Sequence, residues 1–199
     1  MHVIKEILKK MYKVIALIGE SGCGKDSLMK AILATNLGKE QFYEIISYTS
    51  RPIRDNETEG VNYHYVSKEA FENLIISGQM FEYTNFNGWY YGTGINSLNE
   101  NQINIGVFNP DGIRTLIKNP NIQLFTYYLQ TSPKERLIRQ LKREKNPNIE
   151  EIFRRYKTDQ ADFQNLEFPY TLLTNEKHSD VYVNVCHIID EVEDKAGLY

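Results

Sequence analysis

The sequence has few cysteines and no long apolar run, and both absences restrict what the chain can be. Only two of its 199 residues are cysteine, Cys23 and Cys186, and they lie far apart. Two distant cysteines do not make a disulfide framework, so we expect a reducing compartment. No apolar stretch approaches the ~20 residues that a membrane-spanning helix requires. These features favour a cytoplasmic protein that has no membrane partner.

The chain also lacks a strong charge of either sign. It carries 23 Lys and Arg against 26 Asp and Glu, which gives a formal net charge of -3. This balance argues against a nucleic acid as the main partner, because such binding depends on cations that neutralise phosphates. The length and a hydrophobic content of 41% suit one medium domain with a sizeable core. Nothing in the composition indicates an oligomeric state.

Residues 1–13 allow two interpretations. Val3, Ile4, Ile7, Leu8 and Met11 have helical spacing, but Lys and Glu interrupt them too often for a secretory signal. The segment is either a short amphipathic helix packed on the domain or an extension that precedes a true start at Met11.

Alternating apolar and helical patterns predict an α/β core. A buried strand at 13–18 is followed by a glycine-bearing loop at 19–24 and a helix at 26–36, which Gly38 is expected to end. The alternation resumes in the second half of the chain. The strands and helices expected there are 103–108, 112–118, 123–129, a helix from Ser132, 149–163, 170–174 and 179–195. Such alternation is typical of a central parallel sheet flanked by helices.

The middle of the chain has a different pattern, which predicts an inserted α+β subdomain. After an apolar run at 42–48, a short strand is expected at 61–66 and a helix at 67–77, with Ser67 as its N-cap. A hairpin should then span 80–91, because Asn87-Gly88 is a strong turn signal between two β-rich segments.

The loop at 19–26 carries the clearest chemical signal. Its residues Gly-Glu-Ser-Gly-Cys-Gly-Lys-Asp match G-x-x-x-x-G-K between a strand and a helix. Glycines let successive backbone N–H groups point at phosphate oxygens, and the helix N-terminus and the lysine add positive charge. We therefore predict an ATP phosphate site formed by Gly19, Glu20, Ser21, Gly22, Cys23, Gly24, Lys25, Asp26 and Ser27.

Asp26 occupies the place where this motif ordinarily has Ser or Thr, whose hydroxyl ligates Mg²⁺. A carboxylate is a good ligand for a hard cation, so Asp26 is a candidate Mg²⁺ ligand. The alternative is an acid that is stabilised by the positive end of the helix dipole.

The segment Ser47-Tyr48-Thr49-Ser50-Arg51-Pro52-Ile53-Arg54 contains two loop arginines that can present two forks to one phosphate. It is followed by Gly60-Val61-Asn62-Tyr63-His64-Tyr65-Val66-Ser67, by Phe81-Glu82 and by Gly88-Trp89-Tyr90-Tyr91-Gly92-Thr93. In order and approximate spacing, these motifs resemble those of the guanylate kinase family. The resemblance covers about residues 13–94 and thins in the C-terminal half.

The resemblance implies a P-loop nucleoside monophosphate kinase that transfers the γ-phosphoryl group of ATP to GMP or dGMP, with Mg²⁺ accompanying the ATP. It divides a single kinase domain, 1–199, into a core at 13–46 and 95–199, a nucleotide-binding insertion at about 47–94 and a helical lid at about 139–155. The acceptor residues that it implies are Ser47, Arg51, Arg54, Tyr63, Glu82, Tyr91, Thr93 and Asn109. The residues that it implies for catalysis are Lys25, Arg51, Arg139, Arg143 and Arg155, and Asn175 is expected near the adenine of ATP.

One segment departs from the family. Where the family has Asp-Ile-Asp-x-Gln-Gly, this chain has Val107-Phe108-Asn109-Pro110-Asp111-Gly112, so that both family aspartates are replaced. This loss puts guanine specificity and Mg²⁺ handling in doubt, and Asp26 could compensate for one missing charge. A kinase with another acceptor, either a broad deoxynucleoside monophosphate kinase or a sugar-phosphate kinase, is the main alternative. A non-catalytic binding module is disfavoured because Gly19, Gly24 and Lys25 are intact.

Overall fold

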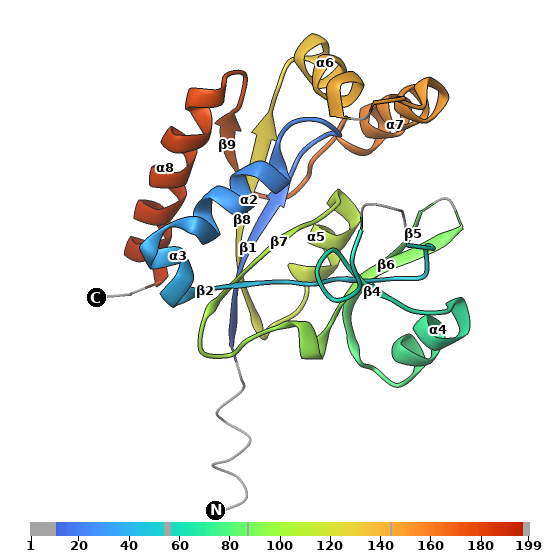
Figure 1. Cartoon of the computed structure of the whole chain (residues 1–199). Helices are drawn as coiled ribbons and strands as arrows, with labels where there is room; N and C mark the ends of the chain where they lie inside the picture. Colours follow the sequence, from blue (N-terminus) through green and yellow to red (C-terminus); the bar gives the residue numbers. More distant parts are fainter. Residues whose placement is uncertain (1–10, 54–56, 87, 144, 197–199) are drawn as a thin grey trace, which may run out of the picture. The chain divides into compact units, whose positions relative to one another are not determined.

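The computed structural model describes residues 11–53, 57–86, 88–143 and 145–196 (Figure 1). The two interpretations of the N-terminal segment therefore fall mostly outside the described residues. In chain order the elements are β1 (Tyr12–Ile18), α2 (Lys25–Ala34), α3 (Asn36–Gln41), β2 (Phe42–Glu44), β3 (Tyr48–Thr49), β4 (His64–Tyr65), α4 (Lys68–Ile76), β5 (Met80–Phe86), β6 (Trp89–Gly94), the 3₁₀ turn η1 (Ile95–Ser97), β7 (Ile103–Val107), α5 (Pro110–Leu116), β8 (Ile122–Gln130), α6 (Pro133–Arg143), α7 (Ile149–Asp162), β9 (Thr171–Thr174) and α8 (His178–Ala196). No helix in these ranges is long and apolar enough to cross a bilayer.

The main sheet confirms the predicted α/β class. Among the described residues it has five strands in the order β2-β7-β1-β8-β9, and β2 pairs with β7, and β8 with β9, in parallel. Residues 14–18 of β1 are all buried. A strand of a parallel sheet is covered on both faces, and for this reason β1 has a continuous apolar run instead of an alternating one.

The smaller sheet is built from the middle of the chain, in the order β4-β3-β6-β5. Strands β5 and β6 form the predicted antiparallel hairpin, and Gly88 in its turn has φ +79°. Helix α4 begins as expected, because the Ser67 side chain accepts a hydrogen bond from the backbone N–H of Ala70 at 3.1 Å. The strand expected at 61–66 is shorter than predicted and is reduced to β4.

The chain separates into two compact units, which we describe one at a time. The first unit comprises residues 1–14, 41–106 and 111–124, so it contains the smaller sheet, α4 and β7. Its core includes Phe71, Ile103, Ile105, Ile113 and Leu116. The second unit comprises residues 15–40, 107–110 and 125–199, so it contains the glycine-bearing loop, α2 and helices α6 to α8. In this unit α2 packs against α8 (Figure 1).

The first helix ends earlier than Gly38 predicted. Thr35 has an extended backbone, its hydroxyl donates to the Ile32 carbonyl at 2.7 Å, and it accepts from the Gly38 N–H at 2.8 Å. Thr35 thus closes α2 and starts α3, which contains Gly38. A Cβ on Gly38 would meet the backbone of Ile32 and Leu33, so this glycine serves close packing between two turns of chain instead of ending a helix.

Candidate functional site

The phosphate loop of the second unit has a shape that requires glycine. Gly22 has φ +84° and Gly24 has φ +100°, values that other residues rarely adopt. A Cβ on Gly22 would lie 2.6 Å from the Arg136 carbonyl oxygen, and a Cβ on Gly19 would lie 2.6 Å from that of Leu129. The glycines therefore allow both the turn and the close approach of neighbouring backbone.

The loop delivers positive charge to the N-terminus of α2. The Lys25 ammonium lies over its own loop, where it donates to the Gly19 carbonyl at 2.6 Å and to the Glu20 carbonyl at 3.3 Å. The residue that caps α2, Gly24, offers no side-chain hydrogen bond to the first turn. A helix N-terminus next to a lysine is an arrangement suited to an anion such as phosphate, and the binding of ATP phosphates by this loop stays a prediction.

Three side chains hold the loop through the Cys23 carbonyl oxygen. It accepts hydrogen bonds from Asn175 Nδ2 at 2.6 Å, Thr131 Oγ1 at 3.2 Å and Arg139 Nη1 at 3.3 Å. Asn175 is only 2% exposed. The structure thus places Asn175 and Arg139 against the phosphate loop, where they fix its backbone, while the role of Asn175 towards adenine stays a prediction.

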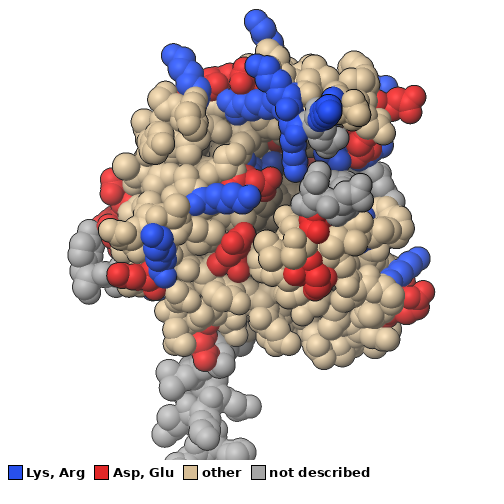
Figure 2. Space-filling view, in the orientation of Figure 1, with Lys and Arg blue, Asp and Glu red and all other residues tan. Residues whose placement is uncertain are grey.

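The other predicted arginines of α6 and α7 lie in different environments. Arg143 is exposed at the end of α6. Arg155 and its neighbour Arg154 both bind Glu151, at 2.8 and 2.6 Å, and together they lower the pKa of this carboxyl to about 2. Figure 2 shows Lys and Arg side chains gathered over the end of the second unit that carries α6 and α7. Helix α6 is rich in cations, whereas α7 mixes acids with cations, and the role of this region as a lid stays a prediction.

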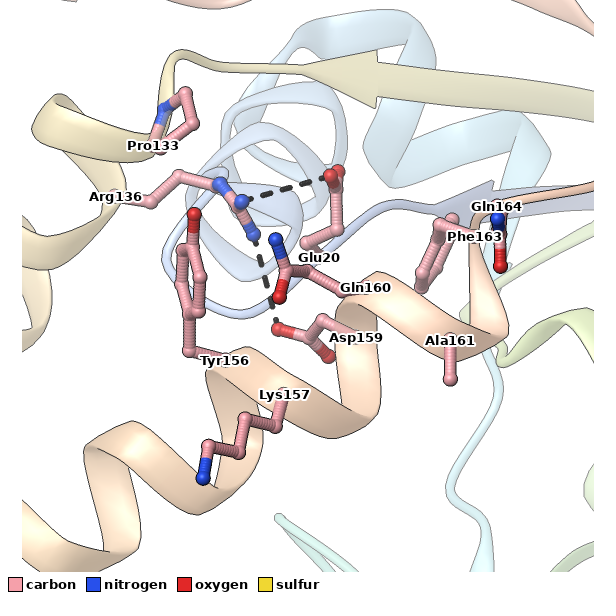
Figure 3. Close-up of a pocket in the computed structure, with 10 residues that line it drawn as sticks. All are labelled: Glu20, Pro133, Arg136, Tyr156, Lys157, Asp159, Gln160, Ala161, Phe163 and Gln164. Carbon is pink, nitrogen blue, oxygen red and sulfur yellow. Dashed lines mark ion pairs between the residues drawn. The ribbon is translucent and has the colours of Figure 1, made fainter.

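A pocket of about 600 Å³ opens beside the loop, between α6 and α7 (Figure 3). Arg136 lies between Glu20, at 3.6 Å, and Asp159, at 3.8 Å, and Asp159 accepts a hydrogen bond from the Ser21 N–H at 2.7 Å. Asp159, Thr131 and Arg136 are not among the residues that the sequence predicts for the site. No local signal marks them, since their roles depend on helices folding back onto the loop.

Asp26 and Ser27 are both exposed in the first turn of α2. The described ranges contain no group of three or more His, Cys, Asp or Glu arranged to hold a metal ion. Asp26 is thus placed as either interpretation of it requires, at the helix N-terminus and next to Lys25.

In the first unit, Arg51 is the buried cation of the acceptor motif, at 8% exposure. Its guanidinium donates to Glu57 at 2.8 Å and to the Pro52 carbonyl at 2.7 Å, and it lies 5.7 and 5.6 Å from the ring centres of Tyr63 and Tyr65. The Tyr65 hydroxyl donates to the same Glu57 carboxylate at 2.8 Å. Burial lowers the pKa of Arg51, but its contacts with Glu57 outweigh this effect, so that the pKa is raised and the charge is fixed.

Glu82 and Thr93 form a buried pair across the hairpin. They face each other in the register of β5 and β6, and the Thr93 hydroxyl donates to Glu82 at 2.7 Å. Glu82 is 5% exposed, and this burial raises the pKa of its carboxyl from 4.5 to about 7, against the opposing effect of the Thr93 hydrogen bond. A carboxylate that gives up hydration in this way needs strong donors to remain ionised.

The remaining acceptor candidates are distributed as follows. Tyr91 packs edge-on against Tyr63 at 6.0 Å, and Ser47 precedes β3, where its carbonyl accepts from the His64 N–H at 2.8 Å. Arg54 lies outside the described residues. Asn109 follows β7, is partly exposed and belongs to the second unit. The first unit therefore brings together Arg51, Tyr63 and Tyr91 at one place and Glu82 with Thr93 at another.

Comparisons with known proteins identify one family. The model of the family described as guanylate kinase matches residues 11–192. A guanylate kinase of Wigglesworthia glossinidia brevipalpis is 36% identical over 168 residues, which are 80% of this chain and 79% of the relative. One of Neisseria meningitidis serogroup B is 44% identical over 79 residues, 40% of this chain and 37% of the relative. The crystal structure of guanylate kinase from Anaplasma phagocytophilum shares the fold, with a TM-score of 0.67 and 17% identity over 95% of this chain and 88% of that one.

Proposed function

Because the chain belongs to the guanylate kinase family, we propose that it transfers the γ-phosphoryl group of ATP to GMP or dGMP, giving ADP and GDP or dGDP. The observation that carries the proposal is the buried pair of Glu82 and Thr93. Guanine has two adjacent donors, N1–H and the 2-amino group, which one carboxylate can accept together. Adenine offers no such pair, so a buried Glu82 would be left unmatched, and a site built in this way rejects it.

On the acceptor side, Arg51, Arg54, Tyr63 and Tyr91 are proposed to hold the phosphate of GMP. The surroundings of Arg51 support this role. Its guanidinium is buried and is oriented by the Glu57 carboxylate, which binds it as a phosphate group would. Ser47, Thr93 and Asn109 are proposed for the edge of the base. Glu57 was not among the predicted residues, and its contacts suggest that it orients Arg51.

On the donor side, the loop at 19–25 is proposed to hold the ATP phosphates, with Lys25 placed over them. Arg139, Arg143 and Arg155 would bring charge to the transferred group, and Arg139 is supported by its position at the Cys23 carbonyl. Transfer in line needs no protein nucleophile, because positioning and electrostatic stabilisation supply the catalysis. The proposed division into a core, an insertion at about 47–94 and a lid at about 139–155 follows from these roles.

Mg²⁺ is proposed to enter with ATP, bound by phosphate oxygens and at most a few protein ligands, as is usual for this ion. Asp26 fits as one such ligand, because an exposed carboxylate follows the lysine of the loop. The ion would neutralise charge on the β- and γ-phosphates. The substitution Asp26→Ser tests this role, and full Mg²⁺-dependent activity in that variant would exclude it.

The function is tested by measuring ADP release from MgATP with GMP, dGMP, AMP, dTMP and dCMP as acceptors. We expect turnover with GMP and dGMP alone, and its loss in Lys25→Met. Turnover with the other acceptors would favour the broader kinase. That alternative is considered because Asn109 stands where the family has an aspartate. Silence with all five nucleotides would favour either a sugar-phosphate kinase or a binding module.

A further inference from the structure

A carboxylate from α7 holds the phosphate loop by its backbone. The Ser21 N–H donates to Asp159 Oδ2 at 2.7 Å, across 138 residues of sequence. The Gln140 side chain of α6 contacts the same residue from another direction, donating to the Ser21 carbonyl at 3.3 Å. The backbone N–H and the carbonyl of Ser21 are therefore both bound, one by α7 and the other by α6.

Arg136 of α6 supplies the countercharge for this carboxylate. It is 3% exposed, and its Nη1 lies 3.8 Å from Asp159 while Nη2 lies 3.6 Å from Glu20 (Figure 3). The Tyr156 ring lies 5.4 Å from its guanidinium carbon. Within the described part of the chain, Nε and Nη1 of Arg136 have no hydrogen-bond partner. The arginine therefore acts on both acids mainly through charge.

The ionisation of Asp159 depends on this balance. Burial raises the pKa of Asp159, and the Ser21 N–H, Lys25 and Arg136 act in the opposite direction. The charged and titratable groups around the carboxylate come from the loop, from α6 and from α7: Glu20, Lys25, Arg136, Tyr156 and Lys157. A protonated Asp159 would be a much weaker acceptor for the Ser21 N–H.

We propose that Asp159 and Arg136 are positioning residues for the ATP site: ionised Asp159 binds the Ser21 N–H and fixes the shape of the phosphate loop, and the charge of Arg136, 3.8 Å away, adds to that of Lys25 in favouring the ionised form. The inference rests on the proposed function in that the loop is taken to bind the phosphates of ATP. It links the loop residue Ser21 to α7 by a charge-assisted hydrogen bond whose acceptor, Asp159, is not among the predicted site residues.

The test is the affinity for ADP, measured by titration calorimetry, which needs no acceptor nucleotide. Asp159→Ala and Arg136→Met should each weaken ADP binding about tenfold, which is about 1.4 kcal/mol. Their KM for GMP should stay unchanged. Arg136→Lys should restore most of the affinity, since it returns the charge. Asp190→Asn, at an exposed position of α8, is the matched control and should bind ADP like the wild type.

The pH dependence separates positioning from a merely structural role. Without Arg136 the pKa of Asp159 rises further, so when the pH is lowered the ADP affinity of Arg136→Met should begin to fall at a higher pH than that of the wild type. If Asp159→Ala does not fold, Asp159→Asn, which keeps the size, carries the same comparison. Unchanged ADP affinity, or an equal loss for ADP and GMP without pH dependence, would overturn the inference. A wild type that binds ADP but fails to phosphorylate GMP would instead refute only the proposed function.

Discussion

Glu82 is the residue at which pH should control recognition of the acceptor. Its carboxyl is 5% exposed, and burial raises its pKa from 4.5 to about 7. If guanine is bound by the ionised form, the apparent KM for GMP should rise as the pH falls through 7. At pH 6 only about one tenth of the free protein is ionised at Glu82, so the KM should be about tenfold higher than at pH 8. The KM for ATP should not follow this profile.

The same ionisation has a consequence for stability. The rise in pKa means that ionising Glu82 lowers the free energy of unfolding by about 3 kcal/mol, compared with the protein in which Glu82 is protonated. Because the pKa of Glu82 is higher in the folded than in the unfolded protein, this part of the unfolding free energy is fully present below pH 4.5 and is lost as the pH rises through 7. Glu82→Gln, which stays neutral, should therefore be more stable than the wild type at pH 8 and nearly equal to it at pH 4.5, while binding GMP poorly.

Both consequences are measured with the same variant, by thermal unfolding at pH 5 and pH 8 and by GMP saturation curves over that range. Glu69→Gln is the control, because Glu69 is an exposed glutamate of the same unit and should leave the GMP profile unchanged. A Glu82→Gln protein that is less stable than the wild type at pH 8, or that keeps a normal KM for GMP, would refute the reasoning.

Three further predictions concern the loop, the acceptor cation and a helix cap. Gly22→Ala should lose at least about 1–2 kcal/mol of stability in urea unfolding and most of its ADP binding, because its φ of +84° is strained for alanine and the new Cβ would meet the Arg136 carbonyl. Arg51→Lys should raise the KM for GMP about tenfold or more at unchanged KM for ATP, since a lysine cannot make the forked contact; equal kinetics would remove Arg51 from the phosphate site. Ser67→Ala should lose about 1 kcal/mol by thermal unfolding, and Ser67→Asn close to nothing, because only the alanine cannot accept from the Ala70 N–H.

Much of the fold is local enough to be read from the chain. The apolar run of β1, the glycine loop and the turn at Gly88 each depend on residues within a few positions, and the structure confirms all three. Thr35 shows the limit of such prediction. Its hydroxyl donates to the Ile32 carbonyl and accepts from the Gly38 N–H, and the predicted helix ends there instead of at Gly38. The family, the fold class and the kinase interpretation are confirmed by the comparisons, while the individual roles of the site residues stay predictions.

By itself, the sequence determined which residue types are available for phosphate and guanine, because motif spacing within one loop or hairpin sets their local geometry. Only the tertiary structure decided how those residues are charged and held. The burial of Glu82 depends on the packing around β5 and β6, and the binding of Ser21 by Asp159 requires α7 to return to a loop 138 residues earlier. Burial and long-range contact are properties of the folded chain, and for this reason Asp159, Thr131 and the role of Arg136 left no local pattern.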